Sequence, residues 1–110
     1  MLMKTRQDID EAGLIAPLFG HVGDGNFHSL LLFDPEKLDE YEACKSVSLK
    51  MGKRAIELGG TCTGEHGIGT GKRELLSEMV GQNGIDCMRA IKNAFDPKGI
   101  LNPGKVLALA

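Results

Sequence analysis

The stretch that decides the fold reads His21-Val22-Gly23-Asp24-Gly25-Asn26-Phe27-His28. Asp-Gly is a strong signal for a two-residue hairpin turn, because a type I′ turn needs positive φ at both of its central residues. If Asp24-Gly25 forms this turn, His21 lies opposite His28 on the neighbouring strand. Their Cβ atoms would then lie about 4.5–5.5 Å apart on one face of the hairpin. The pattern therefore predicts two imidazoles close enough to hold one metal ion.

The composition is that of one small globular domain. The chain has 110 residues and a formal charge of −2, so neither nucleic acid nor an anionic membrane surface is indicated as a partner. The longest apolar run, residues 30–33, is far too short to cross a membrane, and the charged residues 1–10 do not form a signal peptide. Three widely separated cysteines without a CxxC pair favour a reducing compartment over a disulfide framework.

We expect an α+β fold, with a small antiparallel sheet formed around the hairpin, a long helix on one face and C-terminal helices beyond it. Along the predicted long helix, apolar residues recur every three or four positions: Tyr41, Cys44, Val47, Met51, Ala55 and Leu58. The expected elements are helices over 4–12, 36–58, 72–80 and 85–95 and strands over 18–23 and 26–33. In the last helix, Ile85, Met88, Ile91 and Phe95 are expected to face the core.

A second cluster of chemical interest lies in the glycine-rich segment 59–71, which contains Glu65 and His66. Two histidines and one carboxylate, from His21, His28 and Glu65, would give three metal ligands and leave one position open. That number is typical of a catalytic zinc site, and the set also suits iron or manganese. The alternative is that the histidines bind backbone carbonyls of a tight hairpin and Glu65 is solvated.

Other residues near this segment allow several readings. Cys62 could act as a nucleophile with His66 as its base, or it could be a small buried side chain. Lys72 could attract an anionic substrate, or it could simply begin a helix with an exposed charge. Asn26 is expected to cap its own turn. Segment 67–72 is no phosphate loop, because the required glycine and the Ser or Thr after the lysine are missing.

Three motifs together carry a family likeness: the histidine stretch 21–28, Gly64-Glu65-His66-Gly67-Ile68-Gly69, and Asn102-Pro103-Gly104-Lys105. In this order they resemble the C-terminal part of FAD-linked oxidases of the vanillyl-alcohol-oxidase type, which are flavin-dependent 2-hydroxy-acid dehydrogenases. Within the family, the cytochrome-linked D-lactate dehydrogenases and the flavin subunit of glycolate oxidase are most similar. The resemblance covers the chain from about residue 18 to its end.

The resemblance implies a role for each matching residue. His21, His28 and Glu65 would bind a divalent metal, with zinc as the first choice and manganese or iron as alternatives. His66 would be the catalytic base, and Asn102 would lie near the flavin. The implied reaction is oxidation of a D-2-hydroxy acid by FAD, followed by electron transfer to a quinone, a cytochrome or an electron-transfer flavoprotein. Leu30 favours a small acid such as lactate or glycolate.

The family binds FAD mainly through an upstream domain of a few hundred residues. Residues 1–110 are therefore expected to be a partial C-terminal domain, a fragment of a larger flavoenzyme that is inactive alone and able to form homo-oligomers. The expected location is the bacterial cytoplasm or the matrix side of mitochondria. Two alternatives stay open: a standalone metal-binding or assembly module without turnover, and a metal-dependent hydrolase that uses Glu65 as its base.

Overall fold

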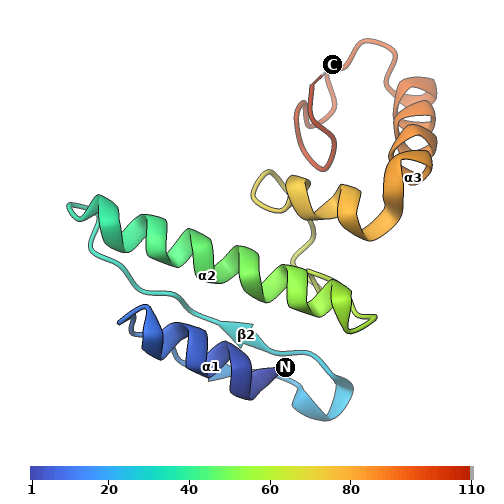
Figure 1. The fold of residues 1–110 in the computed structure, drawn as a ribbon. Helices are drawn as coiled ribbons and strands as arrows, with labels where there is room; N and C mark the ends of the chain where they lie inside the picture. Colours follow the sequence, from blue (N-terminus) through green and yellow to red (C-terminus); the bar gives the residue numbers. More distant parts are fainter. Residues whose placement is uncertain (110) are drawn as a thin grey trace.

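The structure, a computed structural model, describes residues 1–109. In chain order its elements are α1 (Leu2–Glu11), β1 (Leu18–Phe19), the 3₁₀ helix η1 (Val22–Asp24), β2 (His28–Ser29), α2 (Leu38–Glu57) and α3 (Arg73–Phe95). Figure 1 shows α1 and α2 running alongside each other, with α3 beyond the end of α2. This arrangement confirms the expected α+β class. None of these helices is long and apolar enough to cross a membrane.

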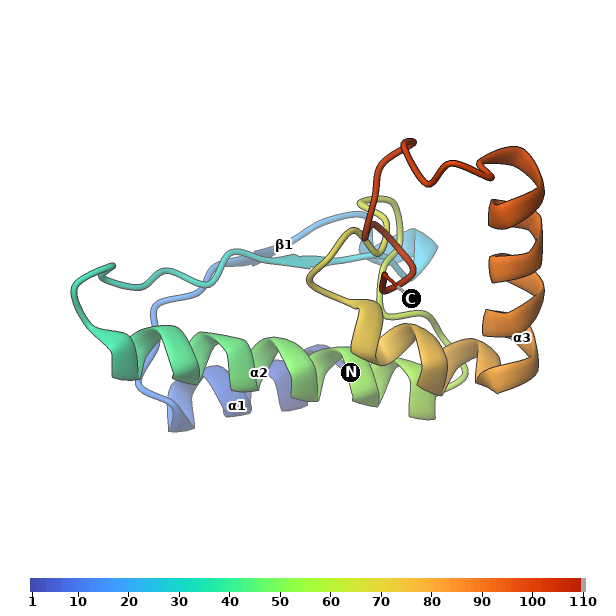
Figure 2. The ribbon, with the colours of Figure 1, turned by 90° about the horizontal axis from the view of Figure 1, so that it is seen from above.

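The core lies between the hairpin and the first two helices. Figure 2 shows the hairpin as one layer and α1 with α2 as the other. Apolar side chains from both layers are buried here: Ile9, Leu14, Ala16, Cys44 and Val47. An ion pair between Arg54 Nη2 and Asp8 Oδ2, 2.6 Å apart, also joins the two helices. This core holds the hairpin against α2. The C-terminal half of α2 lies beside the candidate site described below.

The hairpin has a different register from the predicted one. β1 pairs antiparallel with β2, so that Phe19 lies opposite His28. The predicted two-residue Asp24-Gly25 turn, with His21 opposite His28, is therefore wrong. The physical reason is that the His21 carbonyl accepts the amides of both Asp24 and Asn26, at 2.9 and 3.1 Å. These bonds close a 3₁₀ turn, which left-handed Gly25, at φ 74°, completes.

The longer loop also shortens the paired strands. Each strand has two residues, instead of the runs 18–23 and 26–33, and an isolated bridge pairs Ile15 with Leu32. Gly20 allows the two arms to come this close, because a Cβ there would lie 2.7 Å from the Phe27 Cα. The hairpin is thus held by close backbone approach as much as by sheet pairing.

α2 agrees with the predicted helix to within two residues at each end. Its buried positions include Cys44 and Val47 of the predicted apolar stripe, whereas Tyr41 and Leu58 at the ends of the stripe are exposed. Further along, Gly52 is buried, and a Cβ there would lie 2.3 Å from Leu75 Cδ1 of α3. The second half of α2 therefore packs closely against the start of α3.

The two predicted C-terminal helices form the two halves of α3, which is broken at Gly81 (φ 69°, ψ 171°). The first half buries Leu75 and Leu76, and Leu75 lies against Gly52 of α2. The break directs the second half away from α2, as Figure 1 shows. Ile91 and Phe95 are consequently 55% and 82% exposed, so the prediction that these two residues face the core is wrong.

Asp96 fixes the end of α3 to the C-terminal segment. Its carboxylate is buried, pairs with the Lys92 ammonium and accepts the backbone amides of Ile100 and Leu101 at 3.0 and 2.9 Å. Further on, the Val106 amide donates to the Gly69 carbonyl at 2.7 Å. The C-terminal segment therefore returns to the glycine-rich loop.

Substitution of Gly52 by Ala tests the contact between α2 and α3. The added methyl group overpacks against Leu75, which costs about 1–3 kcal/mol, whereas alanine gains up to about 1 kcal/mol in helix propensity. We expect a net loss of about 1–2 kcal/mol in the free energy of unfolding, measured by urea denaturation. Gly71→Ala is the control, because a Cβ at Gly71 meets nothing within 4 Å. Equal stability of both variants would contradict the packing described.

The Asp96 clamp predicts a dependence of stability on pH. The Lys92 ammonium and the two backbone amides hold the pKa of Asp96 below its ordinary value, although burial acts in the opposite direction. The clamp therefore stabilises the fold above the ordinary aspartate pKa, about 3.9, and this stability is lost as pH falls through the lower folded-state pKa. We expect the stability difference between the wild type and Asp96→Asn to be large at pH 7 and to shrink below pH 4. A difference independent of pH in denaturant titrations would contradict this.

Candidate functional site

His28 is the central residue of the candidate site. Its imidazole lies between two other rings: Phe19 of the paired strand at a centroid distance of 5.4 Å, and His66 at 4.9 Å. The two imidazoles are nearly parallel, with 16° between their planes. The side chain is 20% exposed. Hairpin pairing and ring contacts thus fix an imidazole whose edge still reaches the surface of a cleft.

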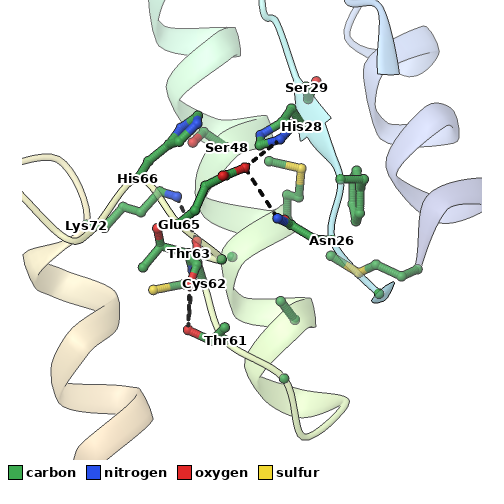
Figure 3. Close-up of a pocket in the computed structure, with 18 of the residues that line it drawn as sticks. Asn26, His28, Ser29, Ser48, Thr61, Cys62, Thr63, Glu65, His66 and Lys72 are labelled. Atoms are coloured by element: carbon green, nitrogen blue, oxygen red, sulfur yellow. Dashed lines mark hydrogen bonds and ion pairs between the residues drawn. The ribbon is translucent and has the colours of Figure 1, made fainter. Parts of the chain in front are cut away.

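Glu65 approaches His28 from the glycine-rich loop. Its Oε1 lies 3.0 Å from His28 Nε2 and also accepts a hydrogen bond from Asn26 Nδ2 at 3.4 Å. Gly64 lets the loop come this close, because a Cβ there would lie 2.6 Å from Asn26 Oδ1. Figure 3 shows these two interactions, with Asn26 and His28 coming from the hairpin side and Glu65 from the loop.

Three of the predicted site residues converge. Potential ligand atoms of His28, Glu65 and His66 all lie within 4.8 Å of one another. Zinc binds nitrogen and oxygen ligands at about 2.0–2.2 Å, which places tetrahedral ligand atoms about 3.5 Å apart. Two imidazoles and one carboxylate are also a suitable donor set for zinc, iron or manganese. The residues present therefore fit a divalent metal without a large rearrangement.

His21, the other predicted ligand, lies outside this group. It is exposed at the start of η1, and its carbonyl accepts the two turn amides. The observed register is the reason, because it places Phe19 opposite His28 and leaves His21 two residues further into the loop. The structure therefore brings together two of the three predicted ligands, and the predicted base stands with them.

The converging residues line a cleft of about 800 Å³. Its walls come from the end of the hairpin, the second half of α2, the glycine-rich loop and the residue before α3. Two hydroxyl oxygens here, on Ser29 and Thr63, are buried without a hydrogen-bond partner among the described residues. The cleft is large enough for a small organic acid and offers polar groups that a ligand can satisfy.

Cys62 and Lys72 have structural contacts in this cleft. Cys62 is 8% exposed and packs on α2, 3.5 Å from where a Cβ on Gly52 would lie. This packing agrees with the interpretation of Cys62 as a small buried side chain. Lys72 Nζ donates to the Cys62 carbonyl at 2.7 Å. The lysine side chain therefore crosses the base of the loop that carries Glu65 and His66.

Asn102 lies in the exposed turn near the C-terminus, with a left-handed φ of 45°. Its carbonyl accepts the Lys105 amide at 3.2 Å, and it is not among the residues that line the cleft. The turn is tied to the start of α3, because Arg73 Nη1 donates to the Gly104 carbonyl at 3.0 Å. The turn that carries Asn102 is thus tied by the Arg73 side chain to the start of α3, and Asn102 itself lies outside the cleft.

Asn26 is the contributor that sequence reasoning missed. It was expected to cap its own turn, but its side-chain amide contacts Glu65 from the other side of the cleft. A signal was present in the sequence: Asn26 lies two residues before His28, and alternate residues of an extended segment share one face.

The comparison with protein families gives one match, which spans residues 1–106: the family described as FAD linked oxidases, C-terminal domain. Among curated proteins, the chain is 46% identical over 109 residues to a probable mitochondrial D-lactate dehydrogenase of Danio rerio. This alignment covers 99% of the chain and 22% of that protein.

Two further relatives have names of the same kind. The mitochondrial D-lactate dehydrogenase [cytochrome] 1 of Saccharomyces cerevisiae is 47% identical, over 96% of the chain and 18% of its own length. The glycolate oxidase subunit GlcD of Bacillus subtilis is 49% identical, over 82% of the chain and 19% of its own length. The chain thus spans about a fifth of the length of these relatives. Motifs, site and matches agree, and the chain belongs to the C-terminal domain family of the FAD linked oxidases.

Proposed function

We propose that this chain forms the C-terminal, substrate-binding part of a flavin-dependent D-2-hydroxy-acid dehydrogenase that acts on a small acid such as D-lactate or glycolate. The observation that carries the proposal is the convergence of His28, Glu65 and His66 on one cleft in a member of an FAD-linked family. The names of the relatives, D-lactate dehydrogenase and glycolate oxidase subunit, support this substrate class.

His66 is the proposed catalytic base. Its exposed ring stands at the cleft against the face of His28, where a substrate hydroxyl can reach it. A neutral imidazole accepts a proton near physiological pH, so His66 removes the hydroxyl proton while the hydride leaves the adjacent carbon. FAD supplies the hydride acceptor when it is bound, and Asn102 is the residue of this chain that we propose to lie near it. The proposed final electron acceptor is a quinone, a cytochrome or an electron-transfer flavoprotein.

His28 and Glu65 are the proposed core of a divalent metal site, with zinc as the first choice and manganese or iron as alternatives. A bound metal supplies positive charge that acidifies the substrate hydroxyl. We propose His21 as the third ligand, because this assignment leaves His66 free to move the proton. His66 is the competing third ligand, since a ring nitrogen of His66 already lies within 4.8 Å of the His28 nitrogen and the Glu65 carboxylate oxygen.

Zinc titration of single-residue variants tests this ligand set. We expect the wild-type chain to bind one ion, and His28→Ala and Glu65→Gln each to lower the affinity by more than tenfold, because each removes a direct ligand. Competition with a chromogenic chelator measures the affinity. Loss of binding in His21→Ala but not in His66→Ala assigns the third ligand to His21, and the reverse assigns it to His66. Wild-type affinity in both His28→Ala and Glu65→Gln would overturn the metal site.

Substitution of His66 by Gln tests the base. In the flavin-loaded enzyme with D-lactate and an artificial electron acceptor, we expect kcat to fall by about 10²–10⁴-fold, the usual contribution of general base catalysis. Zinc affinity should stay within a few-fold if His21 is the third ligand. Turnover of His66→Gln at the wild-type rate would remove His66 from the mechanism. Zinc binding by the flavin-loaded wild-type enzyme without oxidation of any hydroxy acid would favour the alternative function, a metal-binding module.

A further inference from the structure

Lys72 is the single lysine or arginine among the described residues that line the cleft. It stands directly before α3, and its side chain is partly buried. In Figure 3 this side chain extends from the start of α3 toward the segment that carries Thr63 and Glu65. A positive charge is therefore placed on the wall of the cleft beside the converging histidines and carboxylate.

The ammonium group of Lys72 has donors left over. It gives one hydrogen bond, to the Cys62 carbonyl at 2.7 Å, although an ammonium carries three N–H donors. No carboxylate among the described residues lies within 4.0 Å of it. The Glu65 oxygen that could pair with it faces His28 and Asn26 instead. A partly buried charge without a counterion favours an anionic ligand.

Thr63 provides a second donor at the same corner of the cleft. It follows Cys62, whose carbonyl the lysine binds, and it precedes Glu65 by two residues. Its hydroxyl oxygen is buried and has no hydrogen-bond partner among the described residues. An ammonium and a neighbouring hydroxyl group are donors suited to the two oxygens of a carboxylate.

We infer that Lys72 and Thr63 bind the carboxylate of the substrate. The inference rests on the proposed function, because it assigns one end of the same hydroxy acid. In a 2-hydroxy acid the hydroxyl-bearing carbon is bonded directly to the carboxylate carbon. A carboxylate at Lys72 and Thr63 therefore places the hydroxyl group within reach of the converging residues His28, Glu65 and His66. The lysine determines specificity by favouring an acid over its uncharged analogues.

The neighbouring arginine has a different task. Arg73 donates to the carbonyl oxygens of Thr70 and Gly104, at 3.2 and 3.0 Å. Its guanidinium group therefore ties the C-terminal segment to the start of α3, and Arg73 does not line the cleft. Of these two adjacent cationic side chains, Lys72 is therefore the one available to bind a ligand in the cleft.

Binding of three probes to the 110-residue chain tests the inference: D-lactate, uncharged D-lactamide and propionate, each followed by NMR titration. We expect the wild type to bind D-lactate about tenfold more tightly than D-lactamide, because a charge-assisted hydrogen bond to the carboxylate contributes affinity of that size. Lys72→Met should lower D-lactate affinity about tenfold and leave D-lactamide affinity unchanged. Lys72→Gln, which keeps a donor for the Cys62 carbonyl and removes only the charge, should give the same result.

Lys45→Met is the matched control, because Lys45 is exposed on α2 and outside the cleft, and it should bind all three probes as the wild type does. In the unsubstituted protein, the Lys72 side-chain signals should shift with D-lactate and not with D-lactamide, so the test does not depend on the folding of a variant. Equal wild-type affinity for D-lactate and D-lactamide would overturn the inference. So would unchanged D-lactate affinity in both Lys72 variants.

Propionate separates this inference from the proposed function. It has the carboxylate and lacks the hydroxyl group, so Lys72 should contribute to its affinity as it does to that of D-lactate. If both acids depend on Lys72 and D-lactate binds no more tightly than propionate, the carboxylate subsite stands and the proposed hydroxy-acid site fails.

Discussion

The antiparallel pairing of Phe19 with His28 is the constraint on which the site depends. It presents the His28 imidazole between the rings of Phe19 and His66 and directs its Nε2 to Glu65. The core packed beneath the hairpin holds this pairing in place. Glycines then let backbone come close on both sides of the ring, since Gly20 and Gly64 occupy positions where a Cβ would collide with its neighbours.

The elements could be predicted from the sequence because their signals are local. Apolar spacing located α2 to within two residues at each end, and the gap between the predicted helices over 72–80 and 85–95 contains the break in α3 at Gly81. The hairpin register could not be predicted in this way, because Asp24-Gly25 fits both a two-residue turn and the end of a 3₁₀ turn. What decided between them was the His21 carbonyl, which accepts two amides at once. That geometry is not visible in residue types.

The candidate site likewise contains some residues that the sequence predicted and others that only the structure reveals. The glycine-rich loop and the roles implied by the family resemblance predicted that Glu65 and His66 lie near His28, and the fold brings the three together. The spacing of Asn26 and His28 indicates that the two share a face, but the contact of Asn26 with Glu65 is visible only in the structure. The same holds for the buried Thr63 hydroxyl group, which has no hydrogen-bond partner among the described residues. Likewise, the apolar spacing of the second half of α3 could not predict whether anything covers that face. In the part of the chain that the structure describes, this face of α3 leaves Phe95 exposed.

The return of the C-terminal segment to the glycine-rich loop affects the order in which the chain can fold. The hydrogen bond between the Val106 amide and the Gly69 carbonyl closes a long loop of the chain. The conformational entropy lost in closing such a loop costs at least about 3 kcal/mol. Contacts within the hairpin and α1 form between residues much closer in sequence. During synthesis, the loop that carries Glu65 and His66 therefore gains this restraint only after Val106 has left the ribosome. A nascent chain would have a folded hairpin well before it has a completed site.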